Sequence, residues 1–190
     1  MFSKKKVFPD KLLASCLSAA VVCGAGLALP AHAATQGSLG ATSTGTVAIS
    51  ASVPARARLT GLADVAFTSV DPSTAASNAQ SVCAWSNTAT KSYTVTATGS
   101  GTSNAFTLAN GSLTVPYSVQ WSGSAAQTSG SALTAGTASS SFVSTATNQQ
   151  CASGPTASAS LIVGISANDL QTMQASTNYT GTLTLLMTPQ

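Results

Sequence analysis

Apolar and polar side chains alternate along much of the chain after residue 53. In the clearest run, residues 113–121, one phase is entirely apolar and consists of Leu113, Val115, Tyr117, Val119 and Trp121. A period of two is typical of a β-strand with one buried face. Pro116 falls on the polar phase and has no N–H to donate to a ladder, so we expect this strand at a sheet edge or bulged there.

The same period predicts further strands. They are expected at residues 93–97, 157–165 and 179–187, with a short core strand at 82–85 and another near Val65 and Phe67. Asn110 and Gly111 favour a hairpin turn, and residues 166–174 favour one short helix. Regular short strands separated by turns predict an all-β fold, specifically an antiparallel β-sandwich.

Residues 1–33 have the three zones of a secretory signal peptide. A positively charged start through Lys11 precedes an apolar stretch over 12–29 and a small-x-small ending at Ala33. We expect cleavage after Ala33, with Ala34 as the alternative, and hence export of the remainder. A retained membrane anchor is the other interpretation, although the apolar stretch is short for a span.

Small hydroxyl residues dominate the chain after residue 33, with 27 Ser and 27 Thr among 157 residues. Low-complexity linkers share this composition, but the period of two favours strands that present Ser and Thr to solvent. The formal net charge of +3 belongs to the first eleven residues, and the remainder sums to zero.

The charges that remain after residue 33 exclude several classes of protein. They are three basic and three acidic side chains: Arg56, Arg58, Lys91, Asp64, Asp71 and Asp169. Nucleic-acid binders concentrate Lys and Arg on one face, so no nucleic-acid partner is expected. Acid–base enzymes need groups that titrate near neutrality, and this part has neither His nor Glu. We therefore expect no enzyme and no cofactor.

The acidic residues were also weighed as a metal site. Asp64 and Asp71 are only two acids, whereas hard cations usually take more oxygen ligands. Asn168 and Asp169 are better interpreted as the cap of the short helix. Neither pair predicts a metal site.

Two cysteines, Cys83 and Cys151, remain after the expected cleavage. In an exported protein a single pair most simply forms a disulfide. Closing so long a loop stabilises the fold by up to about 4 kcal/mol in the chain-entropy model. Two buried free thiols are the alternative.

Residues 34–53 carry an apolar stripe on their odd-numbered phase. Its members are Leu39, Ala41, Val47, Ile49, Ala51 and Val53, with small or polar residues between them. Such a segment suits β-strand addition, in which backbone bonds give affinity and alternate side chains give specificity. The alternative is that it forms the first strand of its own sandwich.

Three segments resemble subunits of chaperone–usher pili. Residues 45–53, followed by Pro54, are similar to the donor segment of the alpha, or colonisation-factor, class. Residues 114–123 are similar to a mid-chain strand of the same pilins. The ending 178–190 is similar to the terminal strand of these and of the archaic pilins that resemble spore coat protein U.

This resemblance implies an incomplete immunoglobulin-like β-sandwich over residues 54–190, preceded by a donor-strand extension over 34–53. It implies a donor stripe of Val47, Ile49, Ala51 and Val53 and an acceptor groove lined by Leu183, Leu185 and Met187. The implied partners are a periplasmic chaperone, an outer-membrane usher and neighbouring subunits. The implied location is a fimbrium on the bacterial cell surface, and the implied role is that of a shaft or adaptor subunit.

A second function remains open at this stage. A monomeric secreted β-sandwich would instead bind a glycan or a protein through Trp121, Tyr117 and the Ser/Thr-rich loops. Trp85 and Trp121 are, however, more simply interpreted as core or edge packing than as a sugar-binding platform.

Overall fold

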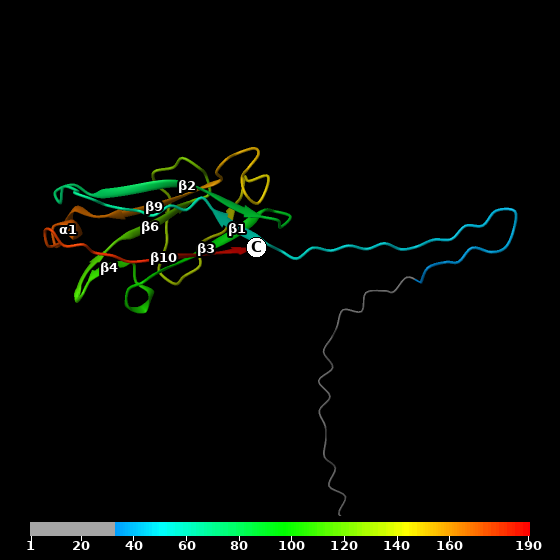
Figure 1. Cartoon of the computed structure of the whole chain (residues 1–190), viewed down its shortest axis with the longest axis horizontal. Helices are drawn as coiled ribbons and strands as arrows, with labels where there is room; N and C mark the ends of the chain where they lie inside the picture. The colour runs from blue at the N-terminus through cyan, green and yellow to red at the C-terminus, as the bar shows by residue number, and fades with distance from the viewer. Residues whose placement is uncertain (1–32) are drawn as a thin grey trace, which may run out of the picture. The chain divides into compact units, whose positions relative to one another are not determined.

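The computed structural model describes residues 33–190 (Figure 1). The predicted signal peptide, residues 1–33, lies outside the described residues except for Ala33. The chain divides after Ser52 into two units, and the β-sandwich belongs to residues 53–190. Within residues 33–190, no helix is long and apolar enough to cross a membrane.

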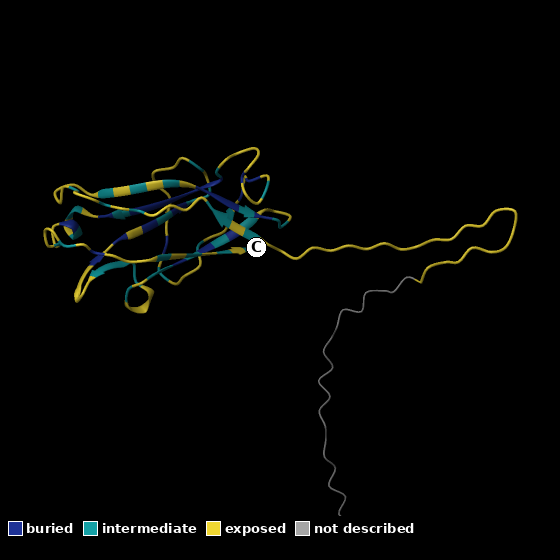
Figure 2. Cartoon of the chain, viewed as in Figure 1, coloured by how far each residue is buried: buried dark blue, intermediate teal, exposed yellow. Residues whose placement is uncertain are grey.

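Residues 33–52 are exposed throughout (Figure 2). Their regular pairing is one antiparallel bridge between Thr35 and Thr46, whose two N–H···O distances are 3.0 and 2.9 Å. The side chain of Ile49 is 91% exposed, and those of Leu39 and Val47 are also exposed. The apolar side chains of this segment are therefore all exposed to solvent.

The first sheet of the sandwich has five antiparallel strands in the order β1–β2–β9–β6–β7. Their bounds are Ala57–Thr60 (β1), Ala76–Ser86 (β2), Ala159–Ile165 (β9), Ser118–Ser122 (β6) and Ser131–Ala132 (β7). The central strand β9 is buried on both faces, including Ile162. Loop residues cover its outer face at Ser160, whose hydroxyl accepts a bond from the Gln127 N–H at 3.0 Å.

The second sheet has three antiparallel strands in the order β10–β3–β8. Their bounds are Leu183–Pro189 (β10), Ser92–Gly99 (β3) and Phe142–Val143 (β8). A hairpin of β4 (Thr107–Asn110) and β5 (Leu113–Pro116) stands beside it, with a short 3-10 turn, Thr102–Asn104, before β4. The all-β antiparallel sandwich predicted from the alternation is confirmed.

The apolar phases of the two sheets meet in one core. Trp121 of β6 and Tyr93 of β3 are both completely buried, and their rings cross edge to face at a centroid distance of 6.5 Å. The Trp121 Nε1–H donates to the Tyr93 hydroxyl at 3.2 Å, which satisfies both polar groups. Burial of an unpartnered polar group would cost free energy, so this bond helps to fix the core.

Pro116 divides the longest predicted strand. Residues up to Pro116 pair with β4, whereas Ser118 onward pairs with β9, so the chain changes partners at Tyr117. The apolar phase continues across the break, since Val115 and Val119 are both buried. The single strand expected over residues 113–121 is therefore wrong: it forms two strands, and Pro116 ends β5, an edge strand whose ladder partner in the described chain is β4.

Cys83 and Cys151 form the predicted disulfide, with Cα atoms 5.9 Å apart. The bond attaches the loop after β8 to β2, and both cysteines are buried with Ala146. Trp85 is half-buried against this small cluster. Trp85 is thus a packing residue beside the disulfide.

Three local predictions need correction. The strand expected near Val65 and Phe67 does not form, and residues 61–68 are irregular. The helix is present as α1, Ala167–Leu170, but its N-cap is Ser166, whose hydroxyl accepts from the Asp169 N–H at 3.1 Å. The hairpin is present, but Asn110 pairs with Leu113, so its turn is formed by residues 111 and 112, with Gly111 at a φ of +58°.

Candidate functional site: an apolar groove between two unpaired edges

One wall of the groove is the irregular segment 62–70, which follows β1. Gly61 has a φ of +83°, a left-handed conformation that glycine adopts without strain. The ladder between β1 and β2 ends just before it, at Thr60. Beyond it, the Gln80 side chain replaces backbone pairing: its Oε1 accepts from the Ala63 N–H at 2.7 Å, and its Nε2 donates to the Ala63 carbonyl at 3.0 Å. Within the described residues, segment 62–70 makes no backbone-to-backbone hydrogen bond.

The opposite wall is β10 together with the residues before it. Every residue of β10 pairs with β3, and β10 is the last strand of its sheet. Upstream, Thr180 exchanges two backbone bonds with Ala109 of β4, at 2.8 and 2.9 Å. The terminal segment is therefore bonded along one edge, and in the described chain its other edge has no ladder partner.

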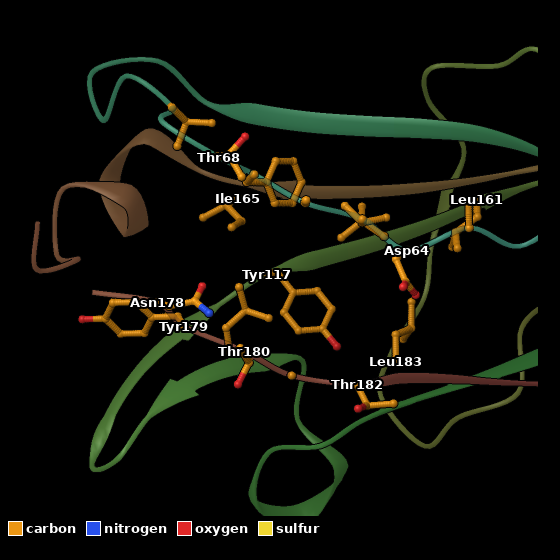
Figure 3. Close-up of a pocket in the computed structure, with 18 of the residues that line it drawn as sticks. Asp64, Thr68, Tyr117, Leu161, Ile165, Asn178, Tyr179, Thr180, Thr182 and Leu183 are labelled. Carbon is orange, nitrogen blue, oxygen red and sulfur yellow. The ribbon is translucent and has the colours of Figure 1, made fainter. Parts of the chain in front are cut away.

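The groove lies between these walls and has a volume of about 710 Å³ (Figure 3). Its floor is apolar and consists of Leu161, Val163 and Ile165 of β9 with the ring of Tyr117. The walls add Val65, Phe67 and Val70 on one side and Leu183 and Leu185 on the other, and Leu170, Met173 and Tyr179 stand at the α1 end. These side chains belong to the main core or pack against it. The groove is thus an open part of the sandwich interior.

Polar groups line the groove beside its apolar floor, and they include the side chains of Thr68, Gln80, Asn178, Thr180 and Thr182. Asp64 is exposed and is the one charged residue among those that line it. The Tyr117 hydroxyl is buried without a hydrogen-bond partner in the described chain, and burial raises the pKa of this hydroxyl above its usual range. The groove therefore combines an apolar floor with polar walls, which suits an occupant that presents apolar side chains on one face and small polar groups elsewhere.

The geometry also limits what can fill the groove. Each wall has backbone groups without a ladder partner in the described chain, although the N–H and C=O of Ala63 are bonded to Gln80, and the apolar floor lies between the walls. A β-strand placed between them would bond to both walls and direct alternate side chains at the floor. A helix or a compact small molecule would leave those backbone groups unpaired, which is costly when they are buried.

The residues predicted for the acceptor groove fall on one phase of β10. Leu183 and Leu185 line the groove, whereas Met187 is half-buried and packs on the core beyond it. Leu186, on the other phase, is 60% exposed. The residues predicted for the donor stripe, Val47, Ile49, Ala51 and Val53, are all exposed.

Several groove residues were not assigned to it from the sequence. The alternation around Val65 and Phe67 predicts a strand, and the pattern over residues 157–165, which contain β9, predicts a core strand without a groove. One signal in the sequence argues against a strand here. Gly61, Ala63 and Asp64 precede the short apolar alternation of Val65 and Phe67, and Gly and Asp are depleted in strands.

Other candidate sites are not supported. Trp121 is completely buried, so its interpretation as a recognition residue is wrong, whereas Tyr117 is 8% exposed and its ring lies in the floor of the groove. Among residues 33–190 there is no group of three or more His, Cys, Asp or Glu residues able to hold a metal ion.

A scan against protein-family models found no match, and no curated protein matched the sequence. The structure itself shows an all-β antiparallel sandwich with one disulfide and an open groove.

Proposed function

We propose that this chain is a structural subunit of a chaperone–usher surface pilus and that it polymerises by donor-strand exchange. Residues 45–53 of one copy would occupy the groove of the next. The observation that carries the proposal is the groove between β10 and segment 62–70, with an apolar floor and an unpaired backbone on each side.

The groove and the N-terminal segment match in chemistry and in length. Segments 62–70 and 45–53 each have nine residues, which reach about 30 Å when fully extended. The segment 45–53 has no charge, and its odd phase presents Val47, Ile49, Ala51 and Val53. Burying four such side chains contributes roughly 1–3 kcal/mol each, apart from the smaller Ala51.

The exposure of the N-terminal segment supports its role as a donor. The first strand of the sandwich in chain order is β1, which begins at Ala57. Exposed apolar stripes and open strand edges promote aggregation unless they are covered. A periplasmic chaperone would cover the groove before assembly, an outer-membrane usher would exchange it for the next subunit, and the product would be a fibre on the cell surface.

The test compares two forms of the exported chain, residues 34–190, expressed in the periplasm. One form is unmodified, and the other carries a second copy of residues 45–53 after Gln190, joined by a Gly/Ser linker. We expect the unmodified chain to form oligomers that resist dissociation and the extended chain to be a monomer. Size-exclusion chromatography with light scattering measures both.

A third form serves as the matched control. It carries the same nine residues in scrambled order, with apolar residues on both phases, after the same linker. It should oligomerise like the unmodified chain. A stable unmodified monomer, or a monomer with the scrambled extension, would contradict the proposal.

A further inference from the structure

The charges of the sandwich are sorted toward its two ends. β2 provides the axis, because its eleven residues span about 33 Å. Three basic side chains lie near its C-terminal end, and two of the three acidic side chains lie near its N-terminal end. In Figure 1 these ends are marked by β1 and by α1, respectively.

The basic end holds Arg56, Arg58 and Lys91. Arg58 stands opposite Trp85 in the β1–β2 ladder, and the Arg56 carbonyl accepts from the N–H of Asn87, just after β2. Lys91 closes the following turn through a 2.9 Å bond from its N–H to the Thr88 carbonyl. All three residues are exposed.

The acidic end holds Asp71 and Asp169. Asp71 is exposed in the turn that leads into β2, where its carboxylate accepts bonds from the N–H and hydroxyl of Ser73, both at 2.8 Å. These bonds hold the pKa of Asp71 below its usual value, so the group is ionised at neutral pH. Asp169 lies on α1, directly after β9, and Ile165 at the end of β9 pairs with Ala76 at the start of β2.

The sandwich therefore has an electric polarity although its side chains sum to zero. The C-terminal residue, Gln190, is bonded to Ser92 near the basic end. If a terminal carboxylate there is counted, the basic end keeps about two net positive charges, which still balance the two acids at the other end. Asp64, in the groove, lies alongside the middle of β2, next to the Ala63–Gln80 bonds.

We infer that successive copies of this chain dock with the basic end of one against the acidic end of the next, and that this pairing sets the direction in which residues 45–53 enter the groove. The inference rests on the proposed function and identifies the partner as a second copy. β10 runs toward the basic end, because Pro189 pairs with Tyr93 next to Ser92. A donor antiparallel to β10 thus ends, at Val53, beside Asp71 and Asp169.

Chain length then brings the opposite charges together. Arg56 is three positions after Val53, a reach of about 10 Å. The basic end of the donating copy must therefore lie close to the acidic end of the accepting copy. Insertion in the other direction would release Val53 at the acceptor's own basic end and oppose two positive ends. Like charges brought together in this way disfavour that direction.

The experiment follows assembly of the chain 34–190 after dilution from urea at 20 mM and 500 mM NaCl, where the screening lengths are about 20 and 4 Å. We expect roughly tenfold slower assembly at 500 mM, because steering between opposite charges raises association rates by ten-fold or more. The variant Asp71→Asn with Asp169→Asn keeps the side-chain acceptors and should assemble slowly at both salt concentrations.

Two further variants make the test specific. Thr128→Lys changes the charge by one unit in an exposed loop near the middle of β2, where the Ala126 N–H donates to Ser81, and should leave the rate unchanged. A charge-swapped chain has its acidic and basic ends exchanged, so opposite ends still attract. It should assemble as fast as the unmodified chain and with the same sensitivity to salt. It carries Asp71→Lys, Asp169→Lys, Arg56→Glu and Arg58→Glu.

A neutral capped peptide of residues 45–53 separates this inference from the proposed function. In excess it should fill the grooves and stop assembly equally at both salt concentrations. If the peptide blocks assembly but the rates are independent of salt and of the end charges, the docking of opposite ends is wrong. If the chain neither assembles nor is blocked by peptide, the proposed function fails and this inference with it.

Discussion

Ile49 offers the sharpest test of how the groove is filled. The test uses the chain with a second copy of residues 45–53 after Gln190, joined by about six Gly/Ser residues, and changes only the residue of that copy that corresponds to Ile49. In a strand between β10 and segment 62–70, this side chain would face the floor formed by Val163 and Tyr117 or their neighbours. Its neighbour, corresponding to Ser50, would face away.

The magnitude follows from the change in exposure. Ile49 is 91% exposed in the unpaired segment, so its burial removes nearly the whole side chain from water. Truncation of a buried Ile to Ala costs about 3 kcal/mol, from the lost transfer free energy and the space left behind. With an m-value of about 2 kcal/mol per molar, the urea midpoint should fall by about 1.5 M.

A charge at the same position should have a larger effect. An Ile49→Asp change in the appended copy would bury a carboxylate with no partner, which is costlier than leaving the groove open. With residues 34–53 removed from the N-terminus in both chains, so that neither can donate to another copy, the midpoint should then return to that of the chain without the appended copy. The matched change Ser50→Asp in the copy should shift the free energy of unfolding by less than about 0.5 kcal/mol.

Urea unfolding followed by tryptophan fluorescence measures these differences, because Trp121 lies in the core. Equal effects of the Ile49→Asp and Ser50→Asp changes would refute the alternation of donor side chains. A copy that gives no stabilisation at all would refute its entry into the groove.

Three other outcomes are expected. Replacing both Cys83 and Cys151 by Ser should lower the free energy of unfolding by about 4 kcal/mol, since the disulfide closes a 68-residue separation; an unchanged urea midpoint would contradict this. Tyr117→Phe should leave stability unchanged or raise it by about 1 kcal/mol, because the hydroxyl has no partner in the described chain, whereas Tyr93→Phe should lower it by a similar amount, because the bond from Trp121 is lost. Burial raises the pKa of Tyr93 and Tyr117 above the ordinary value of 10.0, so the unfolded tyrosines ionise first as the pH rises. The free energy of unfolding should therefore be unaffected by these groups below pH 10 and should fall above it. Unfolding in urea at pH 8 and pH 11 measures the loss.

The strands that were predicted correctly are those in which apolar and polar residues alternate along the strand itself. The alternation around Tyr93, Val95 and Ala97 corresponds to β3, where all three residues are completely buried. The alternation at the C-terminus likewise corresponds to β10, with Leu183 and Leu185 inward and Leu186 outward. Each such strand packs one face on the core, so its period of two is visible in the sequence alone.

The groove could not be predicted in the same way, because it depends on which strand lacks a neighbour. Val65 and Phe67 alternate like strand residues, yet the left-handed backbone at Gly61 and the side chain of Gln80 prevent a ladder there. A pattern reports which face of a segment is buried, but it does not report the partner along each edge. The inward phase of β10, with Leu183 and Leu185, was therefore visible in the sequence, and the opposite wall of the groove was not.

The disulfide also affects how quickly the sandwich can form. The central pair of strands joins Val82 to Ala159, about 77 residues apart in the sequence, and ladders between distant segments are slow to nucleate. Once Cys83 and Cys151 are joined, the shortest path between those two residues falls to about nine residues. The entropic cost of closing the loop falls by about 2 kcal/mol. Oxidation before folding therefore shortens the time during which the unpaired strands of a chain with few charges are exposed to one another.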